Sequence, residues 1–181
     1  MHLVVGGSGQ LGTALVRQLV AAGKPVRAFV RPMSQYQHLI GEAVDLAFGD
    51  LRDVGSIRAA ISGVDVVLAN ANIIAPRYGD TYEKVEGIGY ESLIEEAGQQ
   101  GVRRFVFASV PMSPMDDQVP QFRAKRQTEN ALIDSGVPYT ILRCAPFMEV
   151  WLALPGSSVP LRARRIPPST AHIPFCVGSA R

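Results

Sequence analysis

A glycine-rich segment lies between an apolar run and an amphipathic stretch at the start of the chain. The apolar run is Leu3-Val4-Val5, the segment reads Gly6-Gly7-Ser8-Gly9-Gln10-Leu11-Gly12, and the amphipathic stretch reaches Ala22. A strand, a glycine turn and a helix in this order are typical of the first βα unit of a dinucleotide-binding domain, in which the helix N-terminus faces an anion. The sequence therefore predicts that this segment, including Ser8, Gln10 and Leu11, contacts a dinucleotide.

Three of the glycines have distinct expected roles. Gly6 allows a sharp turn out of the strand, Gly9 leaves space for a pyrophosphate, and Gly12 lets the helix pack closely on the strand. The first two are one residue further apart than in the G-x-G-x-x-G fingerprint. A plain glycine-rich turn is therefore the alternative interpretation.

Composition limits the class of protein. The chain has 181 residues, 47% hydrophobic and 19% charged, which predicts one soluble globular core. A net charge of +2, with scattered basic residues, does not favour a nucleic-acid partner. Cysteine and histidine spacings favour neither a disulfide framework nor a metal site, and no run is long and apolar enough for a membrane span. We expect a cytoplasmic protein without metal; the residues concerned are Cys144, Cys176, His2, His38 and His172.

A repeated pattern predicts the sheet. Four times a helical stretch ends at a glycine and a short apolar, β-branched run follows, as expected for αβ joints. Near-continuous apolar strands that alternate with helices are buried on both faces, which favours a doubly wound parallel α/β sheet in the order 3-2-1-4-5-6. The expected strands are 3–5, 25–30, 43–48, 64–69, 103–108 and 137–142, with a weak helix at 35–40 before the third.

Two acidic residues are expected to open helices. Asp53 precedes a helical stretch that begins at Val54, and is a candidate N-cap. Asp80 with Glu83 resembles a capping box for a long helix over 82–99.

The residue after the second strand indicates which cofactor binds. Carboxylates at this place contact the ribose hydroxyls of NAD, whereas a guanidinium suits the 2′-phosphate of NADP. The chain has no Asp or Glu before Glu42, and Arg31 stands at the strand end. We therefore predict NADP(H) as the cofactor, with an ordinary exposed arginine as the alternative.

Several motifs together resemble a known family, the NmrA-like, atypical short-chain dehydrogenase/reductases that include the isoflavone-reductase-like enzymes. The resemblance covers Met1 to about Trp151. It implies a Rossmann domain that binds NADP(H), with Asp50 and Leu51 beside the adenine, Ala69 and Asn70 along the adenosine, and Ser109 near the nicotinamide. The motifs are the glycine loop, Val30-Arg31, Gly49-Asp50-Leu51, Tyr139-Thr140-Ile141-Leu142-Arg143 and Pro146-Phe147-Met148-Glu149, of which Pro146 and Phe147 are included in the expected cofactor site.

Lys125 and Ser109 are the candidate catalytic residues. The resemblance places Lys125 on the helix after the fifth strand, where a lysine can bind the nicotinamide ribose or pass a proton to a reduced carbonyl, and burial beside cations would favour proton transfer. Typical short-chain enzymes have a tyrosine four residues earlier, and this chain has Gln121 there. Ser109 can orient a carbonyl but cannot protonate it alone. A solvated or purely ribose-binding Lys125 is therefore an equal alternative.

Two function classes remain after this reading. One is an NADPH-dependent oxidoreductase for a small carbonyl or quinone-type substrate, and the other is a non-catalytic NADP(H) sensor. A nucleotide-sugar epimerase is a distant third, because it needs the absent tyrosine. We expect a cofactor domain over 1–150 and an incomplete substrate-side extension over 151–181, which has five prolines and no acidic residue. In this extension Ile173 to Cys176 resembles the start of a strand, and docking of the extension on a second subunit, as in a homodimer, is the other interpretation.

Overall fold

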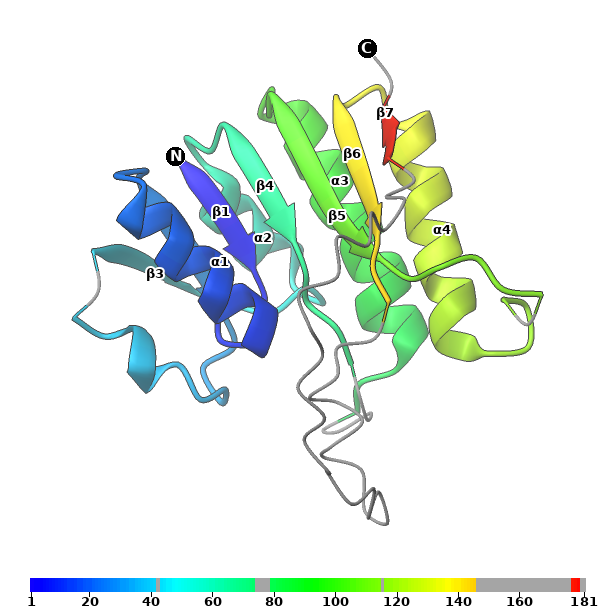
Figure 1. Ribbon diagram of the computed structural model, residues 1–181, viewed down its shortest axis with the longest axis horizontal. Coiled ribbons are helices and arrows are strands. Elements are labelled where there is room, and N and C mark those ends of the chain that lie inside the picture. Colours follow the sequence, from blue (N-terminus) through cyan, green and yellow to red (C-terminus); the bar gives the residue numbers. More distant parts are fainter. Residues whose placement is uncertain (42, 74–78, 115, 146–176, 180–181) are drawn as a thin grey trace, which may run out of the picture.

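The computed structural model describes residues 1–41, 43–73, 79–114, 116–145 and 177–179 of the chain. Within them, seven strands form one sheet in the order β3-β2-β1-β4-β5-β6-β7 (Figure 1). Neighbours from β3 to β6 run parallel, and β7 pairs antiparallel with β6. The strands are β1 His2–Val5, β2 Val26–Val30, β3 Val44–Phe48, β4 Val66–Ala69, β5 Arg104–Ser109, β6 Tyr139–Arg143 and β7 Val177–Ser179.

Six helical segments accompany this sheet in the described part of the chain. Figure 1 shows α1 in front of the sheet and α2 and α3 behind it. Each face has its own apolar core, because side chains alternate along a strand. Val4 packs with Val16 of α1 on one face, whereas Leu3 and Val5 belong to the core that α2, α3 and α4 cover. The segments are α1 Gln10–Ala21, η1 Gln37–Leu39, α2 Val54–Ile61, η2 Glu83–Ile88, α3 Gly89–Gln99 and α4 Pro120–Asp134.

The predicted doubly wound sheet and its strand order are confirmed. All four glycines at the expected αβ joints have positive φ, between 66° and 73°, as left-handed helix caps do: Gly23, Gly63, Gly101 and Gly136. The antiparallel strand β7 was not placed by the sequence pattern, and the segment 173–176 expected to begin a strand lies outside the described residues.

The helix starts agree with the predictions only in part. Asp53 is the N-cap of α2, since its Oδ1 accepts a hydrogen bond from Gly55 N at 3.0 Å. The prediction for Asp80 was wrong: its carboxylate is ion-paired with arginines, and the Thr81 hydroxyl accepts from Lys84 N instead. The expected long helix over 82–99 is divided into a π-helical segment, η2, and α3. The weak helix at 35–40 is reduced to the 3₁₀ turn η1.

The glycine loop is closely packed against itself. Gly6 has φ +83°, and Gly9 N donates to Gly6 O at 3.0 Å where α1 begins. A Cβ on Gly12 would lie 2.0 Å from Gly6 O, so only glycine lets the first turn of α1 approach the loop. The sharp turn and close packing predicted for Gly6 and Gly12 are therefore present.

Glu129 of α4 forms hydrogen bonds with the ends of two neighbouring strands. Its buried carboxylate accepts from Ser109 Oγ, at the end of β5, at 2.5 Å and from Arg143 Nη2, at the end of β6, at 2.7 Å. Arg126 also pairs with it. Burial opposes the charge, but the hydrogen bonds from Arg143 and Ser109 and the charge of Arg126 outweigh it and hold the pKa of Glu129 below its usual range.

We expect Gly12→Ala to lower the free energy of unfolding by about 3 kcal/mol, because the added methyl group overpacks the contact with Gly6. Gly9→Ala is the matched control, since its Cβ would meet Gly6 O at 3.3 Å. Urea denaturation measures both variants. Equal stability of the two would contradict the packing role of Gly12.

We expect Glu129→Gln to lower the free energy of unfolding at pH 7 by on the order of 3 kcal/mol, because it removes one partner of a buried charge cluster. Because the pKa of Glu129 is lower in the folded state than in the unfolded state, its charge stabilises the folded state above the unfolded pKa, and this stabilisation is lost on acidification. Glu129→Gln lacks it, so the free energy of unfolding of this variant should fall less below about pH 4. Denaturation midpoints across pH test this, with the exposed Glu83→Gln as control. An unchanged acid slope in Glu129→Gln would contradict it.

Candidate functional site

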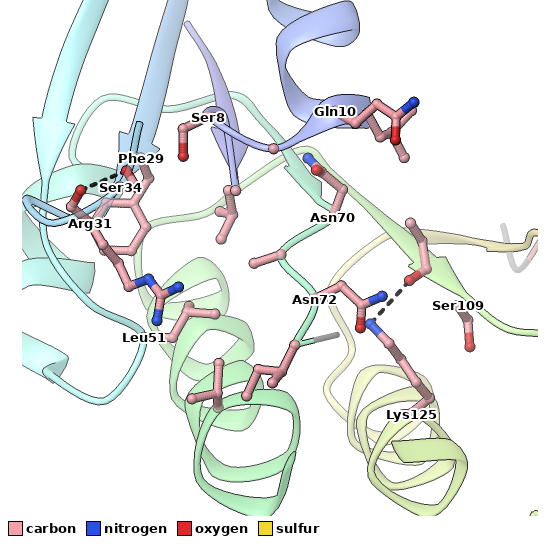
Figure 2. Close-up of a pocket in the computed structure, with 18 of the residues that line it drawn as sticks. Ser8, Gln10, Phe29, Arg31, Ser34, Leu51, Asn70, Asn72, Ser109 and Lys125 are labelled. Atoms are coloured by element: carbon pink, nitrogen blue, oxygen red, sulfur yellow. Dashed lines mark hydrogen bonds between the residues drawn. The ribbon is translucent and has the colours of Figure 1, made fainter. Parts of the chain in front are cut away.

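A cavity of about 510 Å³ lies at the carboxyl ends of β1, β2, β4 and β5. Open α/β sheets bind their ligands at this edge, where the strand order reverses. Figure 2 shows Arg31 and Leu51 on one side of the cavity, Ser109 and Lys125 on the other, and Asn70 between them. The predicted residues that line it are Gly6, Ser8, Gly9, Gln10, Leu11, Arg31, Asp50, Leu51, Asn70, Ser109 and Lys125.

Two residues of the predicted site are described but do not line the cavity. Gly12 lies behind the loop, against Gly6, and does not line the cavity. Ala69 is the last residue of β4, and its side chain is buried in the core, so Asn70 is the first β4-end residue at the cavity. Pro146 and Phe147 lie outside the described residues.

Other lining residues were missed by sequence reasoning. Those that directly follow β4 could have been found, because they continue from Asn70 past the strand end. Val85 carried no signal, since its place depends on how η2 packs. The missed residues are Val5, Phe29, Val30, Ser34, Gly49, Ala71, Asn72, Ile73, Val85, Ala108, Gln121, Phe122, Cys144 and Ala145, and Val110 lines the cavity as well.

The first turn of α1 is open to an anion. Its N-cap, Gly9, provides no side-chain acceptor, so no side chain caps the backbone N–H groups that begin the helix. Ser8, Gly9, Gln10 and Leu11 all line the cavity at this point. The positive end of the helix dipole therefore faces the cavity.

Arg31 is held in place by a buried carboxylate. Its Nη1 lies 2.8 Å from Asp80 Oδ2, and Arg52 pairs with the other oxygen of Asp80 at 2.9 Å. Arg52 also pairs with Asp50 at 2.6 Å, and this hydrogen-bonded contact lowers the pKa of Asp50. Ser34 Oγ donates to Arg31 O at 2.7 Å. The guanidinium of Arg31 is half-exposed at the cavity, with its direction fixed from behind.

Lys125 is buried rather than solvated. Its side chain is 3% exposed, its Nζ lies 3.1 Å from Glu86 Oε2, and it donates to Ala108 O at 3.4 Å. The aromatic rings of Phe107 and Tyr90 lie against it. The charged group beside the ammonium is a carboxylate and not a second cation, so the arrangement that would favour proton transfer is not the one found.

Ser109 has its hydroxyl hydrogen committed to Glu129, as described above. Only its oxygen lone pairs remain for a ligand, so Ser109 can accept a hydrogen bond in the cavity but does not donate one to a carbonyl in this arrangement. Gln121, at the place of the absent tyrosine, donates to Asn72 Oδ1 at 2.7 Å. The amides of Gln121 and Asn72 therefore line the cavity, and Gln121 stands at the sequence position where typical short-chain enzymes have their tyrosine.

The described part of the chain holds neither a metal cluster nor a membrane-spanning helix. There, no three or more histidine, cysteine, aspartate and glutamate side chains are grouped to hold a metal ion. None of the helices described has the length and apolar character needed to cross a bilayer.

Three curated relatives match over different lengths. Sterol demethylase protein B of Methylococcus capsulatus is 46% identical over 109 residues, 59% of this chain and 33% of that protein. A photosystem II assembly factor of Cyanophora paradoxa is 31% identical over 81% of this chain and 46% of its own length. NAD(P)H azoreductase of Xenophilus azovorans is 31% identical over 82% and 49%. The chain thus spans a third to a half of the length of these relatives.

Solved structures share the fold. Triphenylmethane reductase of Citrobacter sp., complexed with NADP(H), superimposes with a TM-score of 0.67 at 24% identity over 83% of this chain and 51% of that chain. An NADPH-dependent quinone oxidoreductase of Escherichia coli gives 0.67 at 24% identity over 84% and 52%. A family model described as NAD(P)H-binding matches residues 6–150. The chain therefore belongs to this NAD(P)H-binding family.

Proposed function

We propose that this chain is the cofactor-binding part of an NADPH-dependent oxidoreductase that reduces a small carbonyl or quinone-type substrate. The observation that carries the proposal is one cavity that joins an open helix N-terminus, a fixed guanidinium and a buried ammonium. The helix N-terminus suits a pyrophosphate and the guanidinium suits a 2′-phosphate, while the ammonium can donate to ribose hydroxyls.

The positions of these groups support one direction for the cofactor. Ser8 to Leu11 would hold the pyrophosphate, Asp50 and Leu51 would lie beside the adenosine, and Ser109 and Lys125 would lie beside the nicotinamide; all of these residues line the cavity. Arg31 then meets the 2′-phosphate. Its ion pair with Asp80 uses one of the five N–H donors of the guanidinium, so the others remain for phosphate oxygens.

NADPH supplies a hydride, and the chain's residues at that end supply binding and orientation. The ammonium of Lys125 binds the nicotinamide ribose hydroxyls or passes a proton to the reduced substrate. Apolar residues that line the same cavity, Val110, Phe122 and Ala145, favour a flat, apolar acceptor. The azoreductase and the quinone and triphenylmethane reductases among the similar proteins support this substrate class.

A non-catalytic NADP(H) sensor is the second candidate. The hydrogen-bonded amides of Gln121 and Asn72 favour it, because neither can act as a proton donor at neutral pH. The photosystem II assembly factor among the relatives supports the same alternative. Cofactor binding is common to both candidates, and turnover separates them.

We expect Arg31→Ala to weaken NADPH binding by about 1.5–3 kcal/mol, the scale of a charge-assisted hydrogen bond, and to leave NADH binding nearly unchanged. Isothermal titration with both cofactors measures this. Lys24→Ala, which removes an exposed cation in the turn after α1, serves as control. Equal weakening of NADH would mean that Arg31 reads something other than the 2′-phosphate.

We expect Lys125→Met to lower turnover of a quinone substrate about 10²-fold or more, with a smaller loss of NADPH affinity, if Lys125 transfers the proton. If it only binds the ribose, affinity and turnover fall together. Cofactor oxidation at saturating NADPH across quinones, aldehydes and ketones is the measurement, and the exposed Lys84→Met is the control. Absence of turnover by the wild-type protein on the whole panel would favour the sensor.

A further inference from the structure

A buried ion pair lies behind the cavity wall, between η2 and α4. Glu86 has no exposed surface, and its Oε2 is 3.1 Å from Nζ of Lys125. Its other oxygen, Oε1, accepts from Ile73 N at 2.7 Å. The carboxylate is therefore fixed from one side by the backbone after β4, and it presents its second oxygen to the ammonium.

The ammonium is enclosed on several sides. Nζ lies 4.9 Å from the centre of the Phe107 ring and 5.5 Å from that of Tyr90, and it donates to Ala108 O at 3.4 Å. Glu86 Oε2 and Ala108 O are two acceptors within reach of its three N–H donors. The third donor is left for a ligand in the cavity that Lys125 lines.

The π-helical segment η2 brings Glu86 to this place. π-helical turns are rare and are frequent at functional sites. Here Val85 of η2 lines the cavity, while Glu86 beside it reaches Lys125. Thr128 of α4, one turn after Lys125, donates to Glu86 O at 2.5 Å and joins the two helical segments. The local geometry is thus held from both elements.

The buried ammonium of Lys125 needs a counter-charge. An ammonium buried without a counter-charge loses its proton, because burial disfavours the charged form. Glu86 supplies the counter-charge, although its own burial raises its pKa above the usual range and Lys125 only partly offsets this. Tyr90 is the other titratable group facing the ammonium; it donates to Ala71 O at 2.7 Å, and burial raises its pKa well above the usual value.

We propose that Glu86 is the positioning residue for Lys125: its carboxylate keeps the ammonium charged and directed into the cavity. Glu86 does not line the cavity, so it acts on a ligand only through Lys125. The effect on NADPH rests on the function proposed above, whereas the effect on the charge of Lys125 does not.

The charge of Lys125 can be measured directly, without cofactor or substrate. The chain has three lysines, Lys24, Lys84 and Lys125, so a protein labelled with ¹⁵Nζ-lysine gives a small, assignable set of NMR signals. We expect Glu86→Gln to lower the titration midpoint of Lys125 by at least about one pH unit, a tenfold change in the protonation equilibrium. Lys24 and Lys84 serve as internal references.

Glu96→Gln is the matched control. Glu96 is also a buried carboxylate in an ion pair, with Arg58 at 2.6 Å, but it lies on α3 away from the cavity. We expect this variant to leave the Lys125 titration unchanged. An unchanged titration in Glu86→Gln as well would overturn the inference.

NADPH binding provides a second readout. Glu86→Gln should weaken NADPH about tenfold in the wild-type background and have no further effect in Lys125→Met, because the two residues act as one unit.

If Glu86→Gln unfolds and Glu86→Gln/Lys125→Met folds, the lone buried cation is the cause and the inference is supported. An equal loss in both backgrounds would overturn it. If Glu86→Gln shifts the Lys125 titration but the wild-type protein does not bind NADPH, the proposed function is refuted and the inference about Glu86 stands.

Discussion

The pairing of β1 between β2 and β4 is the constraint on which the site depends. Because all three strands run parallel, their carboxyl ends meet at one edge, and the chain must leave each of them there. The glycine loop leaves β1 and the Arg31 segment leaves β2. Asn70 leaves β4 at the same edge. The cavity is the space between these segments, and the uncapped N-terminus of α1 faces it.

Buried carboxylates give this edge its definite geometry. Three of them contact cationic side chains from behind: Asp80 contacts Arg31, Glu86 contacts Lys125, and Glu129 contacts Arg143 while it accepts from Ser109. Each carboxylate is at least 95% buried and would be costly without its partners. Two of these cations, Arg31 and Lys125, line the cavity. The cavity therefore presents two positive groups whose counter-charges lie in the protein interior, an arrangement suited to an anionic ligand.

Much of the fold could be predicted from local patterns. The strands are short apolar runs, the αβ joints are marked by glycines with positive φ, and the strand order follows from alternating strands and helices. Asp53 was identified as an N-cap because capping involves residues within one turn. Asp80 had the same local pattern, but two arginines distant in sequence offered stronger partners than the backbone N–H groups. Strong long-range pairs can override a capping motif, and a sequence pattern does not show them.

The amino-acid sequence by itself determined the doubly wound sheet, the glycine loop and the presence of Arg31, Ser109 and Lys125 at strand ends or on the following helix, because these depend on periodicity and order along the chain. Only the tertiary structure decided which charges meet. Glu86 lies 39 positions before Lys125 in sequence yet 3.1 Å from it in space, through the packing of η2 against α4. Side-chain pairing between elements depends on how the helices pack and on which buried charges need a partner. The sequence pattern of a single segment predicts neither of these.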